Sequence, residues 1–298
     1  MHRRSFLAAA SFIAGLSALH AQPDRRLRSR TALWEAPSPT HRFAQRHFDS
    51  VDGLRHYQVF VAVPLGDPPS GGWPAIVMLD GNAAFDDLRQ ADLDHVPGTV
   101  LIGIGYETGG PHDANTRTQD YTPPVAPEDR AGPDDPDPSE EVGGADIFLA
   151  LVAERMLPEL TKDFSLDPAR RALWGHSYGG LFVINALFRN PDLFRSYYAI
   201  SPSLSWHAPL MLRREETSTR RAAGRSDVVI LYDVTQDPRG DERRKARMLQ
   251  ARAMRADMLE RLAARPDIVL TQRAYPGENH GSMFHVGLRA ALDRGIPN

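Results

Sequence analysis

Two patterns of apolar and polar positions alternate along this chain. Short continuous apolar runs predict strands, and apolar residues at helical spacing predict helices. Short apolar runs recur at intervals, and residues 73–79 form one with almost no polar position. Such continuous runs are typical of strands covered on both faces. The first two predicted strands should pair through the turn at Asp52 and Gly53. We predict strands at residues 42–48, 56–64, 73–79, 99–105, 171–174, 194–200, 228–234 and 268–274.

Between several of these runs the apolar spacing changes to that of a helix. Residues 146–162 place Phe148, Val152, Met156 and Leu160 at every fourth position, which puts them on one helix face. Alternating strands and helices predict an α/β fold with a mostly parallel central sheet, as one domain over residues 31–298. Further helices are predicted at residues 178–188, 241–264 and 284–293.

One stretch interrupts this alternation. Residues 123–141 are rich in proline and aspartate and contain almost nothing that could be buried. This composition predicts a mobile loop. An inert surface insertion and a lid beside a functional site are both open; we expect a flexible loop near the site and make no prediction of gating.

The first residues differ from the rest. Arg3 and Arg4 precede an apolar run at 5–19, and the small residue Ala21 follows. This predicts an export signal at residues 1–21, followed by a polar leader at 22–30, with no stable membrane anchor after cleavage. Arg-Arg-Ser-Phe-Leu at 3–7 resembles the twin-arginine signal and favours the periplasm. An uncleaved anchor, or a general secretory signal with an accidental arginine pair, remains open.

Charge and cysteine content narrow the function classes. The 298 residues have a formal net charge of −3, so nucleic acid is not expected as a partner. The chain contains no cysteine. That excludes disulfides, thiolate catalysis, cysteine-based zinc sites and lipoprotein anchoring.

Gly-His-Ser-Tyr-Gly at 175–179 matches the nucleophile elbow G-x-S-x-G. An apolar strand leads into it and an apolar helix follows, as in an α/β-hydrolase with helices on both faces of the sheet. The tight turn forces close backbone approach, so glycine is expected two positions on either side. Ser177 is the predicted nucleophile; the alternative is a glycine-rich turn with an incidental serine.

A neutral serine hydroxyl needs a base, which in this fold follows the last strand. His280 occupies that position, directly after the strand predicted at 268–274, and is the predicted base. His285 is a rival, but it lies inside the closing helix. His176 lies next to the nucleophile, where its ring is poorly placed to deprotonate Ser177.

The third catalytic member, an acid, should follow the strand at 228–234. Asp237 is our first candidate and Asp233, nearer the strand end, is the alternative. Each could instead serve a turn or a helix cap. A Ser–His dyad without an acid also remains open.

An oxyanion formed at the serine would need two backbone N–H donors. The residue after the nucleophile, Tyr178, is predicted to supply one. The loop after the third strand should supply the other, with Asn82 as first candidate and Gly81 as the alternative. The competing interpretation of Asp80-Gly81-Asn82 is an ordinary turn.

Four segments in this order resemble the putative-esterase family of α/β-hydrolases, most closely its enterochelin-esterase-like, periplasmic salmochelin/enterobactin hydrolase branch. The segments are Leu-Asp-Gly-Asn at 79–82, Gly-His-Ser-Tyr-Gly-Gly at 175–180, Ser-Pro-Ser at 201–203 and His-Gly-Ser at 280–282. The resemblance covers nearly the whole chain after the signal. It implies hydrolysis of ester bonds in a tricatecholate siderophore, which frees its iron.

The branch also tends to carry Arg-x-x-Asp-aromatic-Thr-Pro, which residues 117–123 match. A guanidinium would help to hold an anionic ferric tricatecholate, and Arg117 is the candidate. The alternative is a salt bridge from Arg117 to Asp120 or Glu107. The many arginines of helix 241–264 are interpreted as a solvated surface. The acid loop at 233–241 and the insertion at 123–141 depart from the pattern of the branch.

The resemblance and the motifs together predict a serine esterase that needs no cofactor. The same mechanism could act on an acyl, feruloyl or thioester substrate, or transfer the acyl group to an alcohol. A periplasmic binding protein that kept the fold but lost turnover is the alternative from another class. It would require a broken catalytic set, and the presence of both Ser177 and His280 argues against it.

Overall fold

The computed structural model describes residues 33, 37–108, 110–126, 141–219, 223–234 and 242–297. The predicted signal at 1–21 and leader at 22–30, most of the predicted loop at 123–141, and Asp237 lie outside these residues.

One sheet holds the strands of the described chain, and each predicted strand is present in it with only its ends shifted. The strands lie side by side in the order β1-β2-β4-β3-β5-β6-β7-β8. Their bounds are β1 (His41–Asp49), β2 (His56–Pro64), β3 (Trp73–Met78), β4 (Val100–Tyr106), β5 (Leu166–His176), β6 (Ser196–Ile200), β7 (Ser226–Asp233) and β8 (Ile268–Tyr275).

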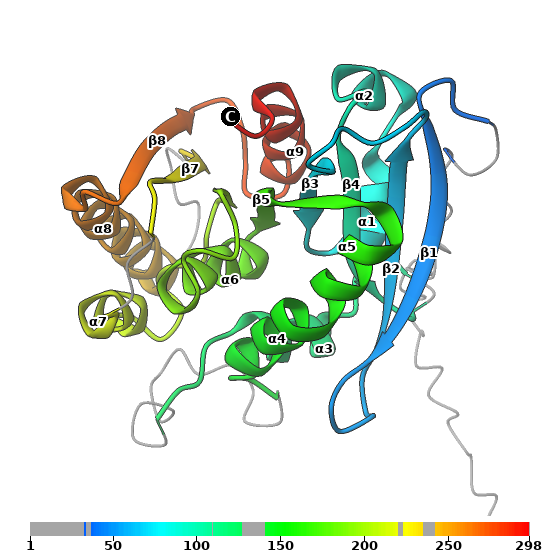
Figure 1. Cartoon of the computed structure of the whole chain (residues 1–298). Helices are drawn as coiled ribbons and strands as arrows, with labels where there is room; N and C mark the ends of the chain where they lie inside the picture. Colours follow the sequence, from blue (N-terminus) through cyan, green and yellow to red (C-terminus); the bar gives the residue numbers. More distant parts are fainter. Residues whose placement is uncertain are drawn as a thin grey trace, which may run out of the picture.

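The strand β2 runs against both of its neighbours, and every other pair in the sheet is parallel. The β1–β2 hairpin turns at the predicted Asp52 and Gly53, where the N–H of Gly53 donates to the carbonyl of Ser50 (2.9 Å). Figure 1 shows this hairpin at one end of the sheet and β8 with α8 at the other. The parallel strands end at one common edge, which brings together the loops that follow them.

The helices connect successive strands. The predicted helix at 146–162 is continuous, formed by α4, a π-helical turn at Val152–Met156, and α5. The helices α1, α2, α3 and α7 were not predicted, because each has at most eight residues and too few turns to show a periodicity. The helix bounds are α1 (Gly81–Asp87), α2 (Gln90–His95), α3 (Ala114–Tyr121), α4 (Ala145–Leu151), α5 (Leu157–Phe164), α6 (Tyr178–Arg189), α7 (Leu210–Thr217), α8 (Glu242–Ala264) and α9 (Met283–Arg294).

Both faces of the sheet carry an apolar core. Successive residues of β3 point to opposite faces, so Ile76 packs in one core and Val77 in the other. The helices α1, α2 and α9 cover the first face, whereas α3 to α8 cover the second. This is the layered α/β architecture that the sequence predicts. In the described residues, no helix has both the length and the apolar character needed to cross a membrane.

Candidate active site

Ser177 lies in a sharp turn between β5 and α6. Its backbone has φ +60° and ψ −117°, a conformation that side-chain-bearing residues rarely adopt. The turn is held by two hydrogen bonds: the N–H of Ser177 donates to the carbonyl of Ile200 (3.0 Å), and the N–H of Ser203 donates to the carbonyl of Ser177 (3.2 Å). The strained serine is therefore tied to the end of the neighbouring strand β6.

Two glycines make the turn possible. A Cβ atom on Gly175 would lie 2.4 Å from the carbonyl oxygen of Gly179, and one on Gly180 would lie 2.9 Å from that of Ile200. A Cβ on Gly179 would come no closer than 3.6 Å to the atoms around it, which is an ordinary contact. The prediction that only glycine fits is therefore confirmed at Gly175 and wrong at Gly179. The second position where a side chain would clash is Gly180.

His280 lies in the loop between β8 and α9, and its imidazole reaches Ser177. The Nε2 atom is 3.0 Å from the Oγ of Ser177, although the two residues are 103 positions apart. Asn279 and Ser282 shape the loop: the Asn279 side chain accepts the N–H of Ser282 (3.1 Å), and the Ser282 hydroxyl accepts the N–H of Asn279 (3.0 Å). The position of the imidazole is thus set by a locally closed turn.

His176 is buried beneath this loop and does not bond to Ser177. Its Nε2 lies 2.7 Å from the backbone carbonyl oxygen of His280. Burial, together with the nearby His280, lowers the pKa of His176 to about 4, so the neutral ring donates its N–H. The other rival, His285, is exposed and paired with Asp87 (2.7 Å). The structure therefore brings His280 to Ser177, with His176 supporting its loop.

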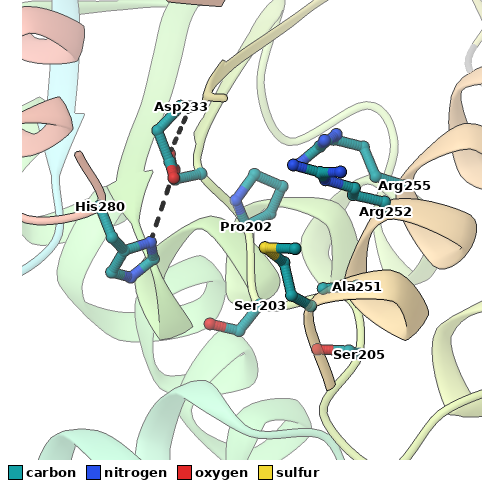
Figure 2. A pocket seen from close by; sticks show the side chains of 10 residues that line it. Pro202, Ser203, Ser205, Asp233, Ala251, Arg252, Arg255 and His280 are labelled. Atoms are coloured by element: carbon teal, nitrogen blue, oxygen red, sulfur yellow. Dashed lines mark hydrogen bonds and ion pairs between the residues drawn. The ribbon is translucent and has the colours of Figure 1, made fainter. Parts of the chain in front are cut away.

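Of the two acid candidates, Asp237 lies outside the described residues. Asp233 ends β7, and its Oδ1 is 3.8 Å from the Nδ1 of His280 (Figure 2). The same oxygen accepts a hydrogen bond from the hydroxyl of Ser201 (2.8 Å). A separation of 3.8 Å exceeds a hydrogen bond, so in this arrangement Asp233 acts on the imidazole through its charge.

Asp80 forms more than an ordinary turn after β3. Its backbone is left-handed (φ +51°, ψ +46°) and its side chain is buried. Arg117 holds the carboxylate at both oxygens, with Nε 2.7 Å from one and a terminal nitrogen 2.9 Å from the other. Burial opposes ionisation, but the charge of Arg117 and hydrogen bonds from His112 and Arg117 hold the pKa of Asp80 well below its usual range.

This pairing corrects the alternative considered for Arg117. Its partner is Asp80 and neither Asp120 nor Glu107. Asp120 is buried and accepts from the hydroxyls of Tyr57 (2.9 Å) and Tyr106 (3.2 Å). Burial raises the pKa of Asp120 to about 6 despite the nearby charge of Arg55. The segment 117–123 therefore anchors α3 to the sheet through Asp120 and the Asp80 loop through Arg117.

The predicted oxyanion donors belong to the first turns of two helices. Tyr178 is the first residue of α6, and Gly81 and Asn82 begin α1. The side-chain amide of Asn82 is buried and paired with both backbone groups of Tyr106, at 2.8 and 3.1 Å. The positive ends of both helices thus adjoin the serine, and the assignment of the two N–H donors stays a prediction.

Two hollows flank the imidazole of His280. The larger, which we call the serine-side pocket, has a volume of about 660 Å³. Its wall includes both Ser177 and Arg117. Its lining residues are Asp80, Ala83, Asp86, Asp87, Pro111, His112, Ala114, Arg117, His176, Ser177, His280, Gly281, Phe284 and His285.

The smaller hollow, which we call the arginine pocket, has a volume of about 200 Å³. Arg252 and Arg255 of α8 enter it from the side opposite His280 (Figure 2). The prediction that the arginines of this helix form a solvated surface is therefore wrong for these two. The pocket is lined by Ser201, Pro202, Ser203, Ser205, Asp233, Met248, Ala251, Arg252, Arg255 and His280.

Sequence reasoning missed several of these residues. Ser203 lies with its Oγ 3.4 Å from that of Ser177, yet the Ser-Pro-Ser motif carries no signal of this contact. The pair Arg252 and Arg255 had a usable signal, because they share one helix face with Met248 and Ala251. Among the described residues, no cluster of three or more His, Asp or Glu side chains is arranged to bind a metal ion.

Comparison with known proteins gives relatives that are named as siderophore esterases. The chain is 38% identical over 199 residues to the apo-salmochelin esterase of Escherichia coli O6:H1, an alignment covering 66% of this chain and 62% of that protein. It is 37% identical over 181 residues to the ferri-bacillibactin esterase BesA of Bacillus subtilis, covering 57% of this chain and 62% of BesA. The alignments thus span less than two thirds of either relative.

A solved structure is similar to this chain over most of its length. The enterobactin hydrolase IroE in complex with DFP superposes with a TM-score of 0.66 at 31% identity, covering 87% of this chain and 96% of IroE. The family profile described as "Putative esterase" matches residues 54–294. The chain therefore belongs to the putative-esterase family and has the α/β-hydrolase fold.

Proposed function

We propose that this protein is a serine esterase that hydrolyses the ester bonds of a tricatecholate siderophore and so releases its iron. The observation that carries the esterase chemistry is the 3.0 Å approach of the His280 Nε2 to the Ser177 Oγ. A nucleophile and a base within hydrogen-bonding reach are the minimum for acyl transfer. The names of the relatives support the substrate class, since two are siderophore esterases and a third is an enterobactin hydrolase.

In the proposed mechanism, Ser177 attacks the ester carbonyl while its proton passes to Nε2 of His280. The negative charge that develops on the carbonyl oxygen would be stabilised by the N–H groups of Tyr178 and of Asn82 or Gly81. His280 then returns the proton to the leaving alcohol oxygen, which frees the alcohol and leaves an acyl-serine. Water, deprotonated by the same imidazole, attacks the acyl-serine and releases the acid and Ser177.

The acid that supports His280 is proposed to be Asp233 or Asp237. Asp233 is favoured by its position, because its carboxylate faces the Nδ1 side of the ring at 3.8 Å. A negative charge there stabilises the imidazolium that forms in each half of the reaction. Arg117 is proposed to contact the substrate from the wall of the serine-side pocket, from a position held by Asp80.

We further propose that the chain is exported to the periplasm through the predicted signal at 1–21, and that residues 31–298 form one catalytic domain after the leader at 22–30. The basic residues and apolar run at the amino terminus support this proposal. Fractionation of cells expressing the tagged full chain, with Arg3→Lys/Arg4→Lys as the variant, tests the route. Accumulation of unprocessed variant in the cytoplasm is expected if the twin-arginine route is used.

The test of function compares ferric enterobactin, iron-free enterobactin and p-nitrophenyl butyrate as substrates of the purified protein. We expect cleavage of the siderophore, and a loss of at least about 10³-fold in kcat for Ser177→Ala and for His280→Ala. Cleavage of p-nitrophenyl butyrate alone would leave an esterase of another substrate class, such as acyl or feruloyl esters. Siderophore binding without turnover would instead identify a binding protein.

A further inference from the structure

The arginine pocket has a charge pattern that the esterase mechanism does not use. Arg252 and Arg255 are three residues apart on α8, so both guanidinium groups belong to one helix face. Like charges so close on a helix destabilise it slightly. Both groups nevertheless line the pocket that borders His280 (Figure 2). An anion between or beside the two guanidinium groups would relieve this repulsion.

The side chain of Arg255 is held in place before any ligand binds. Its guanidinium lies over the ring of Tyr232, 4.1 Å from the ring centre. Stacking of this kind orients the planar group and leaves its edge available to an oxygen ligand. The side chains of Arg252 and Arg255 are half-buried, so their field is screened less than that of an exposed arginine.

The two pockets differ in the balance of charge on their walls. In the arginine pocket, the described lining residues include two arginines and one carboxylate, Asp233, which accepts from Ser201, faces His280 and also acts through its charge on Arg255. In the serine-side pocket, three aspartates face a single arginine. An anionic arm of the substrate would therefore be favoured on the side of α8.

We propose that the arginine pocket is an anion subsite that receives a metal-bound catecholate of the substrate and makes the enzyme prefer the ferric siderophore to the iron-free one. The ferric tricatecholate is trianionic, whereas the iron-free molecule keeps its catechol protons near neutral pH. The volume of about 200 Å³ equals that of about seven water molecules, which suits one catecholate arm and excludes the whole complex. This subsite rests on the proposed siderophore esterase function and specifies the iron state on which it acts.

Measuring substrate binding in a variant that cannot turn over tests the subsite independently of catalysis. In a Ser177→Ala background, the dissociation constants of ferric and iron-free enterobactin are measured by quenching of tryptophan fluorescence, with and without Arg252→Gln/Arg255→Gln. We expect the double substitution to weaken binding of the ferric form by about 10²-fold and each single substitution by about 10-fold, because each removes a charge-assisted contact. Binding of the iron-free form should change by less than about 3-fold.

The matched control is Arg42→Gln, an exposed arginine on β1 at the opposite end of the sheet order, where equal loss of charge should leave both constants unchanged. Arg252→Lys/Arg255→Lys keeps the charge and should retain most of the ferric preference. Thermal unfolding of each variant shows whether the fold is kept.

Two results distinguish the subsite from the function on which it rests. Equal ferric binding by the double variant and its parent would overturn the anion subsite, even if the wild-type protein hydrolyses the siderophore. Absence of siderophore hydrolysis by the wild type, together with arginine-dependent ferric binding to Ser177→Ala, would overturn the proposed function and leave the subsite supported.

Discussion

The serine-side pocket and the arginine pocket share the imidazole of His280, yet they use arginine in opposite ways. In the serine-side pocket, Arg117 is bound at two points to the buried carboxylate of Asp80. In the arginine pocket, Arg255 is oriented by an uncharged ring, that of Tyr232. Arg117 is thus fixed by a bidentate ion pair on one side of the base, whereas Arg255 is stacked on a ring, with the charge of Asp233 nearby, on the other.

This difference separates the contribution of an arginine to folding from its contribution to recognition. A charge that is paired inside the protein mainly holds neighbouring segments, here α3 and the loop after β3. A charge that lines a pocket can in addition act on a ligand that enters it. The charge of a side chain alone does not decide between these roles; the partner that the fold supplies does.

Of the two kinds of arginine, the paired Arg117 should contribute more to the free energy of unfolding. Arg117→Gln leaves the Asp80 carboxylate buried without its guanidinium and should reduce the free energy of unfolding by about 3–5 kcal/mol. Arg255→Gln, which loses a contact with an aromatic ring, should cost at most about 1–2 kcal/mol. Urea unfolding followed by circular dichroism measures both values, and Asp80→Asn/Arg117→Gln should recover part of the loss. Equal costs at the two arginines would contradict the comparison.

The next largest effect is expected on kcat when Asp233, the acid on the arginine-pocket side of His280, is substituted. Asp233→Asn removes a charge 3.8 Å from the imidazole, where Coulombic stabilisation lies between about 1 kcal/mol in water and about 4 kcal/mol at an effective dielectric constant of 20. We expect kcat for p-nitrophenyl butyrate to fall by about 10²-fold. Asp237→Asn is the parallel variant. A larger loss for Asp237→Asn would assign the acid to that residue, and small losses for both would favour a Ser–His dyad.

The smallest effect on kcat is expected from substituting His176, which lies beneath the loop of the base His280. His176→Phe removes the hydrogen bond to the His280 carbonyl and should lower kcat by about 10-fold with little change in KM, because the imidazole is held less firmly. His176→Gln, which restores a donor, should recover part of the rate. Burial lowers the pKa of His176 to about 4, so above about pH 5 the shape of the pH–rate profile should not change in either variant. A shifted profile would show that His176 titrates in the reaction.

Much of this molecule follows from local features of the chain. Apolar runs such as 73–79 are typical of covered strands, and a glycine at Gly175 is needed where β5 turns directly into α6. The succession of strands along the chain and the loop that carries His280 follow from these patterns. The short helices α1, α2, α3 and α7 do not, because they form where neighbouring elements supply their packing.

Tertiary structure alone decided the partners of the charged side chains. Arg117 meets Asp80 across 37 positions of sequence, although the sequence suggested Asp120 or Glu107. Arg252 and Arg255 face a pocket because α8 packs beside the loop after β6. Their spacing along α8 places them on one helix face, but it does not show what that face meets. Apolar burial depends on the periodicity of one segment, whereas an ion pair or a pocket depends on where distant segments meet. The sequence therefore determined the strands, the longer helices and the candidate serine and histidine, and the fold determined the short helices and the partners of the charged side chains.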